Sequence, residues 1–181
     1  MTGFVEAEYK AFMNREAAEV AFHSSYEEFK GKRVPTLSQS MLDVIGKPVS
    51  DSYCVDASCI GNPGPMEYQC IHTASRKRIF RQGPYENGSN NIGEFLAIVH
   101  ALALFTQRGD TLPIYTDSET ALTWVKKKKC KTNLPKDAKN ASIFELIKRA
   151  EDWLDQKTYP NQILKWNTNA WGEIPADFGR K

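Results

Sequence analysis

The hydrophobic pattern divides the chain at about residue 50. Beyond it, short apolar and β-branched runs alternate with longer stretches whose apolar residues lie three and four positions apart. The short runs predict strands at about 52–60, 66–74, 78–83, 112–116 and 162–167, and the longer stretches predict helices at about 91–107, 118–129 and 141–157, before a short C-terminal helical segment. Three hairpin-linked strands followed by alternating helices and strands indicate an α/β protein with helices packed on a mixed sheet.

The first 50 residues have a weaker pattern. They predict one amphipathic helix from Asn14 to Lys30, with alanines and Phe22 on its apolar side, and a short extended piece from Tyr9 to Phe12 before it. Glycine, proline and serine then interrupt the chain as far as Val49, which is typical of a linker. We therefore expect a small N-terminal part over 1–31, a linker over 32–50 and a globular domain over 51–181.

Composition narrows the class of protein. The 181 residues contain no apolar run of membrane-spanning length and no charged-then-apolar leader, so we expect a cytoplasmic protein without membrane contact. No two of the four cysteines have CxxC spacing, and the three histidines do not complete a zinc pattern. A net charge of +2 indicates no particular partner. The basic cluster of Lys126–Lys129 and Lys131 is either a solvated helix end or a surface that faces phosphates.

An acidic residue stands in the first predicted strand. In "YCVDASCIGNPGP", Asp56 continues a buried run and is followed by the turn residues Gly-Asn-Pro-Gly. Burying an ionised carboxylate costs several kcal/mol, as an order of magnitude, unless a partner compensates it. Asp56 therefore either accepts hydrogen bonds from the turn amides or is neutralised by a cation.

Two more acids stand at the ends of predicted elements. Glu94 lies in the first turn of "NNIGEFLAIVHALALF", a helix without charge over the next eleven residues, and it either suits the helix dipole or belongs to a site. Asp117 ends the strand "LPIYTD", where it either caps the next helix or, if Ser118 is the cap, remains free for a ligand. The carboxyl ends of strands are the usual place for ligands in α/β sheets.

The last acids form a pair. Glu173 and Asp177 are four residues apart in "WGEIPADFGRK", so on a helix they share one face. Because like charges repel there, either both are exposed near the terminus or a cation compensates them. If all five acids converge, their oxygens suit Mg²⁺ or Mn²⁺ rather than zinc. A carboxylate cage for two such ions is a device for cutting phosphodiesters.

These motifs together resemble type-1 ribonuclease H. "VDASCIGNPGP" resembles the first-strand motif of that family, "NNIGEFLAIVHAL" its first-helix motif and "IYTDSETAL" its fourth-strand motif. The resemblance covers about 51–181. It implies a ribonuclease H fold, with a mixed five-stranded sheet and helices on both faces. It also implies a monomeric endonuclease that hydrolyses the RNA strand of RNA–DNA hybrids and leaves 5′-phosphomonoesters.

Three regions refine the resemblance. Many members carry a loop histidine before the last aspartate, but here Glu173 stands four residues before Asp177, as in a bacterial subgroup. The lysine cluster replaces a separate helix and basic loop. The N-terminal "GFVEAEYKAFMNREAAEVAF" resembles the second half of a small hybrid-binding, viroplasmin-like domain whose first half is missing.

The resemblance implies roles for the acids. Two Mg²⁺ or Mn²⁺ ions per active site would be held by Asp56, Glu94, Asp117 and Asp177. Asp56 would bridge them, Asp117 would share the ion that activates water, and Glu94 with Asp177 would hold the ion at the leaving oxygen. Glu173 would position water or assist product release.

The resemblance also implies a set of substrate-binding residues. Asparagine amides and Glu94 would contact RNA 2′-hydroxyls, polar residues would hold a DNA phosphate, and an aromatic ring would pack on a DNA sugar. The implied residues are Asn62 and Asn90 for the RNA, Asn91 for both strands, Thr132 and Thr168 for the phosphate, and Trp124 for the sugar. By themselves, the asparagines are equally compatible with turns and caps, and the tryptophan with a core position.

Other functions fit the sequence less well. Another nuclease of the same fold, such as a proofreading exonuclease, would need Asp-x-Glu in the first strand, whereas Ser58 stands in the third position here. A hybrid-binding module without catalysis would have lost one of the acids, and all are present. We therefore expect a nuclease that binds RNA–DNA hybrids.

Overall fold

The computed structural model describes residues 39–179, so the predicted N-terminal helix and extended piece lie outside the described residues. The chain divides into two compact units, Met1–Val44 and Ile45–Lys181, and the second contains the whole sheet. Between residues 39 and 179, no helix combines the length and the apolar character needed to cross a bilayer.

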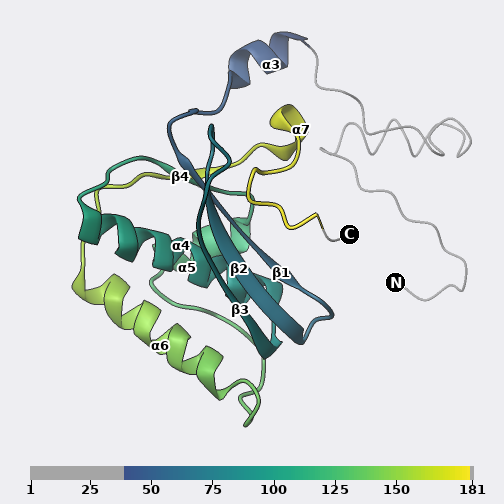
Figure 1. Cartoon of the computed structure of the whole chain (residues 1–181), viewed down its shortest axis with the longest axis vertical. Coiled ribbons are helices and arrows are strands. Elements are labelled where there is room, and N and C mark those ends of the chain that lie inside the picture. The colour runs from purple at the N-terminus through teal and green to yellow at the C-terminus, as the bar shows by residue number, and fades with distance from the viewer. Residues whose placement is uncertain (1–38, 180–181) are drawn as a thin grey trace, which may run out of the picture. The chain divides into compact units, whose positions relative to one another are not determined.

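Five strands form one mixed sheet (Figure 1). Its order is β3-β2-β1-β4-β5; β1 pairs antiparallel with β2 and β2 with β3, whereas β1 with β4 and β4 with β5 are parallel. The predicted mixed five-stranded sheet is confirmed. The strands are β1 (Tyr53–Cys59), β2 (Gly64–His72), β3 (Arg78–Gly88), β4 (Ile114–Thr116) and β5 (Ile163–Lys165).

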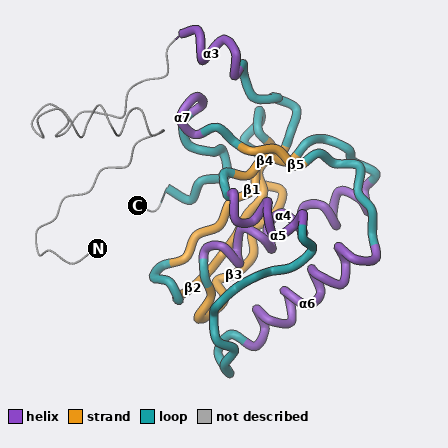
Figure 2. The backbone as a smooth tube through the Cα atoms, turned by 180° about the vertical axis from the view of Figure 1, so that it is seen from behind, coloured by secondary structure: helices purple, strands orange, loops and turns teal. Residues whose placement is uncertain are grey.

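The two faces of the sheet are covered differently. The helices α4 (Asn90–Arg108), α5 (Glu119–Lys126) and α6 (Ala141–Gln156) gather on one side of it (Figure 2) and share the main core with alternate strand residues such as Val55. On the other face, Cys54, Tyr115 and Trp166 pack with the C-terminal segment, which contains the short helix α7 (Thr168–Trp171). Helices therefore lie on both faces, but the long ones all lie on one.

Strand β3 is longer than the sequence pattern indicates. The sequence pattern predicts a strand over about 78–83, whereas β3 continues to Gly88. Gly83 has a φ of +101°, and the pairing with β2 shifts register between Met66 and Tyr68, so the chain bulges without leaving the sheet. β3 is an edge strand, the position in a sheet where proline is tolerated.

A helix also occupies part of the predicted linker. Helix α3 (Gln39–Ile45) lies within 32–50, and Gly46 follows it with a φ of +70°. No glycine or proline interrupts the segment "QSMLDVI", so a short helix can form until the left-handed glycine ends it. The predicted linker therefore contains one short helix that the sequence pattern did not indicate.

The predicted C-terminal helical segment is shorter than expected and lies earlier. Helix α7 ends at Trp171, and Gly172 follows with a φ of +75°. Glu173 and Asp177 lie in the bends and turns beyond it, so they do not share a helix face. The left-handed glycine and Pro175 end regular structure at this point.

Candidate active site

Parallel pairing of β1 with β4 places two of the acids side by side. Tyr53 pairs with Ile114 and Cys54 with Tyr115, and Asp56 and Asp117 each stand two residues beyond the second pair. Both acids follow Cys54 and Tyr115 by two positions, so both lie on the face of the sheet that the C-terminal segment covers. Ser118 is the N-cap of α5 and accepts a hydrogen bond from the amide of Ala121, which leaves the Asp117 side chain free of that role.

Helix α4 brings the third acid to the same place. The helix begins at Asn90, one residue earlier than predicted, so Glu94 is its fifth residue rather than part of the first turn. A Cβ on Gly93 would lie 2.7 Å from the Cβ of Ala57, which shows how closely the helix approaches β1. The Asn90 Nδ2 donates to Glu94 Oε1 at 2.9 Å and orients the carboxylate.

Three carboxylates therefore meet at one point. One oxygen each from Asp56, Glu94 and Asp117 lie within 4.8 Å of one another. Asp56 and Glu94 are each only 8% exposed, and Asp117 is half-buried. Three acidic oxygens so close together form a donor set that suits a hard cation. We call this group the acid cluster.

The electrostatics of the acid cluster follow from burial and mutual repulsion. Desolvation, followed by the charge of Asp117, raises the pKa of Asp56 to about 8. Desolvation also raises the pKa of Glu94 to about 7, although hydrogen bonds from Ser118 and Asn90 oppose the rise. The pKa of Asp117 is raised by desolvation as well, and Lys165 partly offsets this. Without a cation, the folded protein holds these carboxylates at a cost in free energy.

The two C-terminal acids lie beside the acid cluster but outside the group of three. The charge of Asp177 raises the pKa values of Asp56 and Asp117, and that of Glu173 raises the pKa of Asp117, so both lie within electrostatic reach. Both are exposed. The Asp177 Oδ2 accepts from the backbone amide of Gly179 at 2.9 Å.

Two hydrogen bonds hold the segment that carries these acids. Gln69, which pairs with Asp56 across β1 and β2, donates from Nε2 to the carbonyl of Ala176 at 2.6 Å. Trp166 donates from Nε1 to the carbonyl of Gly172 at 2.8 Å. The pattern of apolar residues predicts a strand ending near Trp166, but not these long-range partners.

Lys165 is a positively charged residue beside the acid cluster that the sequence pattern did not indicate. Lys165 ends β5, pairs with Thr116 in the parallel register, and donates from Nζ to the carbonyl oxygen of Asp117 at 2.8 Å. It lowers the pKa values of both Glu94 and Asp117. One signal in the sequence could have indicated Lys165. It is a basic residue at the end of β5, which runs parallel to β4, and Asp117 directly follows β4.

A groove next to α4 collects four of the predicted substrate-binding residues. It has a volume of about 500 Å³ and includes Asn62, Asn91, Trp124 and Thr132 in its lining. Trp124 is 8% exposed and meets Phe95 edge to face, so it belongs to both core and groove. We call this the asparagine groove. Lys131 from the lysine cluster also lines it.

The remaining predicted binding residues lie elsewhere. Asn90 contacts Glu94 and is not part of the asparagine groove. Thr168 is the first residue of α7, on the face covered by the C-terminal segment, and does not line the groove. The short helix after β5 takes Thr168 away from this groove, and its role in binding a DNA phosphate stays a prediction. Lys129 forms an ion pair with Glu151, which ties one lysine of the cluster to α6.

Comparison with known proteins agrees with this arrangement. Residues 51–163 match the family described as RNase H, a range that includes the acid cluster but neither Glu173 nor Asp177. The chain is 37% identical over 65 residues to a protein named Ribonuclease H from Neorickettsia sennetsu, an alignment covering 35% of this chain and 42% of that protein. It is 31% identical over 100 residues to a Ribonuclease H from Nitratidesulfovibrio vulgaris, covering 51% and 64% of the two chains.

Solved structures of the same kind are also similar. RNase H1 from Halobacterium salinarum matches with 20% identity and a TM-score of 0.43, over 65% of this chain and 87% of that chain. LC11-RNase H1, isolated from compost, matches with 16% identity and a TM-score of 0.43, over 64% and 84%. Because the family match spans more than half of the chain and contains Asp56, Glu94 and Asp117, this protein belongs to the RNase H family.

Proposed function

We propose that this protein is a metal-dependent endonuclease that hydrolyses the RNA strand of RNA–DNA hybrids. The observation that carries the proposal is the acid cluster, in which three carboxylates from β1, α4 and the end of β4 lie within 4.8 Å. Membership of the RNase H family supports it. The chain spans 42% and 64% of the two relatives named Ribonuclease H, and the proposal extends their name to this chain.

The residues present fit divalent metal ions. Asp56, Glu94 and Asp117 offer oxygen ligands only, and their raised pKa values reflect repulsion that a cation would relieve. We assign Asp177 as a fourth ligand, because its charge reaches both aspartates. Two Mg²⁺ or Mn²⁺ ions in such a cage would supply an activated water and stabilisation of the leaving oxygen.

The chain's own side chains organise the rest of the reaction. Hydrolysis forms a bond from a water oxygen to phosphorus and breaks the bond to the 3′ oxygen, which takes up a proton. Asn90 keeps Glu94 oriented towards the acid cluster. Lys165 contributes a fixed positive charge next to Asp117. We assign Glu173 the positioning of water or the release of product, and we propose that this chain belongs to the subgroup in which a glutamate replaces the loop histidine.

The asparagine groove supplies a binding surface for the hybrid. Asn62 and Asn91 present amides that can donate to and accept from 2′-hydroxyls, and Thr132 and Lys131 can bind a DNA phosphate. The N-terminus of α4 borders the groove through Ser89 and Asn91, which favours an anion there. Contacts to sugar and phosphate imply little sequence preference.

Cleavage of a labelled RNA–DNA hybrid tests the proposal. We expect cleavage only with Mg²⁺ or Mn²⁺, with 5′-phosphate products, and none of double-stranded RNA or DNA. Asp117→Asn removes one ligand charge without changing side-chain shape and should abolish turnover. Asp155→Asn, an exposed acid on α6, is the matched control and should keep wild-type turnover. Full activity of Asp117→Asn at saturating Mg²⁺ would contradict the assignment.

A further inference from the structure

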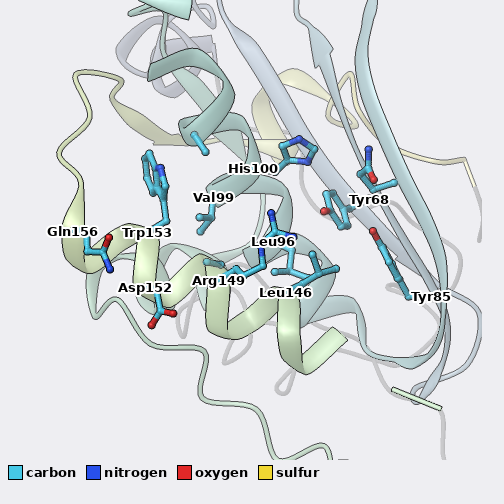
Figure 3. A pocket seen from close by; sticks show the side chains of 13 residues that line it. Tyr68, Tyr85, Leu96, Val99, His100, Leu146, Arg149, Asp152, Trp153 and Gln156 are labelled. Carbon is cyan, nitrogen blue, oxygen red and sulfur yellow. The ribbon is translucent and has the colours of Figure 1, made fainter. Parts of the chain in front are cut away.

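A second cavity lies on the face of the sheet that α4 and α6 cover, and none of the three acids of the acid cluster lines it. It has a volume of about 510 Å³ and opens between α4, α6 and the strands β2 and β3 (Figure 3). Tyr68 lines it, whereas its neighbour Gln69 contacts the C-terminal segment on the other face. The cavity is therefore separate from the proposed catalytic site.

The lining combines an apolar floor with aromatic walls. Leu96 and Val99 of α4 and Leu146 of α6 form the floor, while Tyr68, Tyr85, His100 and Trp153 stand around it (Figure 3). His100 stacks on Phe80 with ring centroids 4.0 Å apart and an interplanar angle of 17°. The size and the apolar, aromatic lining are those of cavities that hold small organic molecules.

One positive charge faces this aromatic space. Figure 3 shows the Arg149 side chain extending from α6 towards the space between Leu96 and His100. Its charge adds to the effect of burial in lowering the pKa of His100, which keeps that ring neutral, and opposes the rise in the Tyr68 pKa that burial causes. Arg149, Tyr68 and His100 all line the same cavity.

Arg149 has no acidic partner among residues 39–179. The ion pairs of this part of the chain do not include it, and the neighbouring Asp152 pairs with Lys148 instead. An unpaired guanidinium beside a hydrophobic pocket favours an anionic group, to which it can donate two parallel hydrogen bonds. The neutral imidazole of His100 adds a further donor and acceptor.

We propose that this cavity binds a planar aromatic molecule that carries one anionic group, the combination present in a nucleoside monophosphate. The ring would stack among the tyrosines and His100, and the phosphate would pair with Arg149. Asp152 stands at the rim with its charge compensated by Lys148, so it does not repel the anion strongly.

Binding of adenosine 5′-monophosphate tests this, followed by ¹H–¹⁵N NMR on the full chain in EDTA, where no divalent ion links the nucleotide to the acid cluster. We expect saturable shifts at Val99, Ala103 and Ala150, weaker binding of adenosine, and no such shifts with inorganic phosphate alone. Shifts confined to the acid cluster or the asparagine groove, or equal affinity for adenosine and its monophosphate, would overturn the proposal.

Three variants distinguish binding of the nucleotide in this cavity from non-specific electrostatic attraction to the protein surface. Arg149→Gln should weaken the nucleotide about tenfold and leave adenosine within about twofold, as expected for loss of one charge-assisted contact. Lys157→Gln, an exposed cation just beyond α6 that does not line the cavity, is the matched control and should change neither. Ala103→Phe should fill the cavity and abolish binding while hybrid cleavage persists. An equal loss in Lys157→Gln, or binding that survives Ala103→Phe, would overturn the proposal.

Discussion

At the scale of single residues, the acid cluster is costly to the folded protein until a cation binds. Asp56 is almost fully buried and lies next to Asp117 in the parallel register, so desolvation and repulsion act together on it. Asn90 and Lys165 compensate only part of this. The fold can keep a carboxylate in a buried strand because a metal ion that binds the folded state restores the stability that the buried charge removes.

The metal-free protein should therefore lose stability as the pH rises. Folded pKa values of about 8 for Asp56 and about 7 for Glu94 lie above the unfolded values, so the folded state binds more protons between about pH 4 and pH 8. The free energy of unfolding, measured in urea with EDTA, should fall from pH 5 to pH 8. Millimolar Mg²⁺ should remove the fall, and Asp56→Asn should flatten it. A stability that rises over this range in EDTA would contradict the prediction.

The two C-terminal acids should differ in their effect on cleavage. Asp177→Asn removes the charge of an assigned ligand and should abolish turnover at ordinary Mg²⁺, with recovery at higher metal concentration. Glu173→Gln should lower turnover less, by about 10²–10⁴-fold at most, because a positioning or proton-transfer role has that size. Single-turnover cleavage across Mg²⁺ and Mn²⁺ concentrations measures both. A Glu173→Gln variant without turnover at any metal concentration, beside an Asp177→Asn variant that keeps its turnover at ordinary Mg²⁺, would mean that the roles are reversed.

At the scale of elements, the close contact of α4 with β1 and β2 positions Glu94. Gly93 makes this approach possible, because a Cβ there would lie 2.7 Å from the Cβ of Ala57 and 3.2 Å from Cγ of Met66. Asp56 and Asp117 can lie close to Glu94 only if α4 stays this close to β1. Packing thus opposes helix propensity at residue 93.

Gly93→Ala should accordingly destabilise the protein. Propensity alone would favour alanine by roughly 1 kcal/mol, but the clash requires α4 to move, and overpacking of this kind costs about 1–3 kcal/mol. Chemical denaturation should show a net loss, and Mg²⁺ should stabilise the variant less than the wild type because Glu94 is displaced. Gln107→Ala, exposed on the same helix, should stay within about 0.5 kcal/mol. If Gly93→Ala were more stable than the wild type, α4 could move away from β1 at little cost in free energy, and the prediction would be wrong.

At the scale of the whole molecule, the residues just before β1 form hydrogen bonds with residues of the sheet and of α7. The Trp171 Nε1 donates to the carbonyl of Gly46 at 2.8 Å, and the amide of Val49 donates to the Tyr115 hydroxyl at 3.1 Å. Trp171 and Tyr115 belong to the cluster beneath the C-terminal segment that carries Asp177. Residues 46–49 therefore support the proposed active site.

Two truncations should separate this support from any hybrid binding by the N-terminal part. Removal of residues 1–44 keeps the contacts of Gly46 and Val49, and we expect nearly unchanged cleavage of a long hybrid, because the acid cluster and the asparagine groove lie beyond residue 44. Removal of residues 1–50 loses both contacts and should lower the melting temperature and kcat. Steady-state kinetics and thermal melts measure both. A large rise in KM for the shorter truncation would show that the N-terminal part binds substrate.

The sequence by itself determined the elements and the chemistry of the site. Periodicity reports burial and propensity along a short stretch, so it located the five strands and the three long helices. It left open whether Asp117 or Ser118 caps α5, and the structure shows that Ser118 does. The sequence also indicated the acids, because an ionised carboxylate in an apolar strand or helix is costly unless a cation or hydrogen bonds compensate it.

Only the tertiary structure decided how those residues meet. The parallel register of β1 with β4 joins Asp56 to Asp117 across 61 positions of sequence, and no local pattern encodes which strands pair. The same holds for Gln69 and the C-terminal segment, for Thr168 outside the asparagine groove, and for Arg149 facing the aromatic rings of two strands. These contacts depend on side-chain packing between segments that are distant in sequence. The spacing of residues along the chain does not reveal which segments pack together.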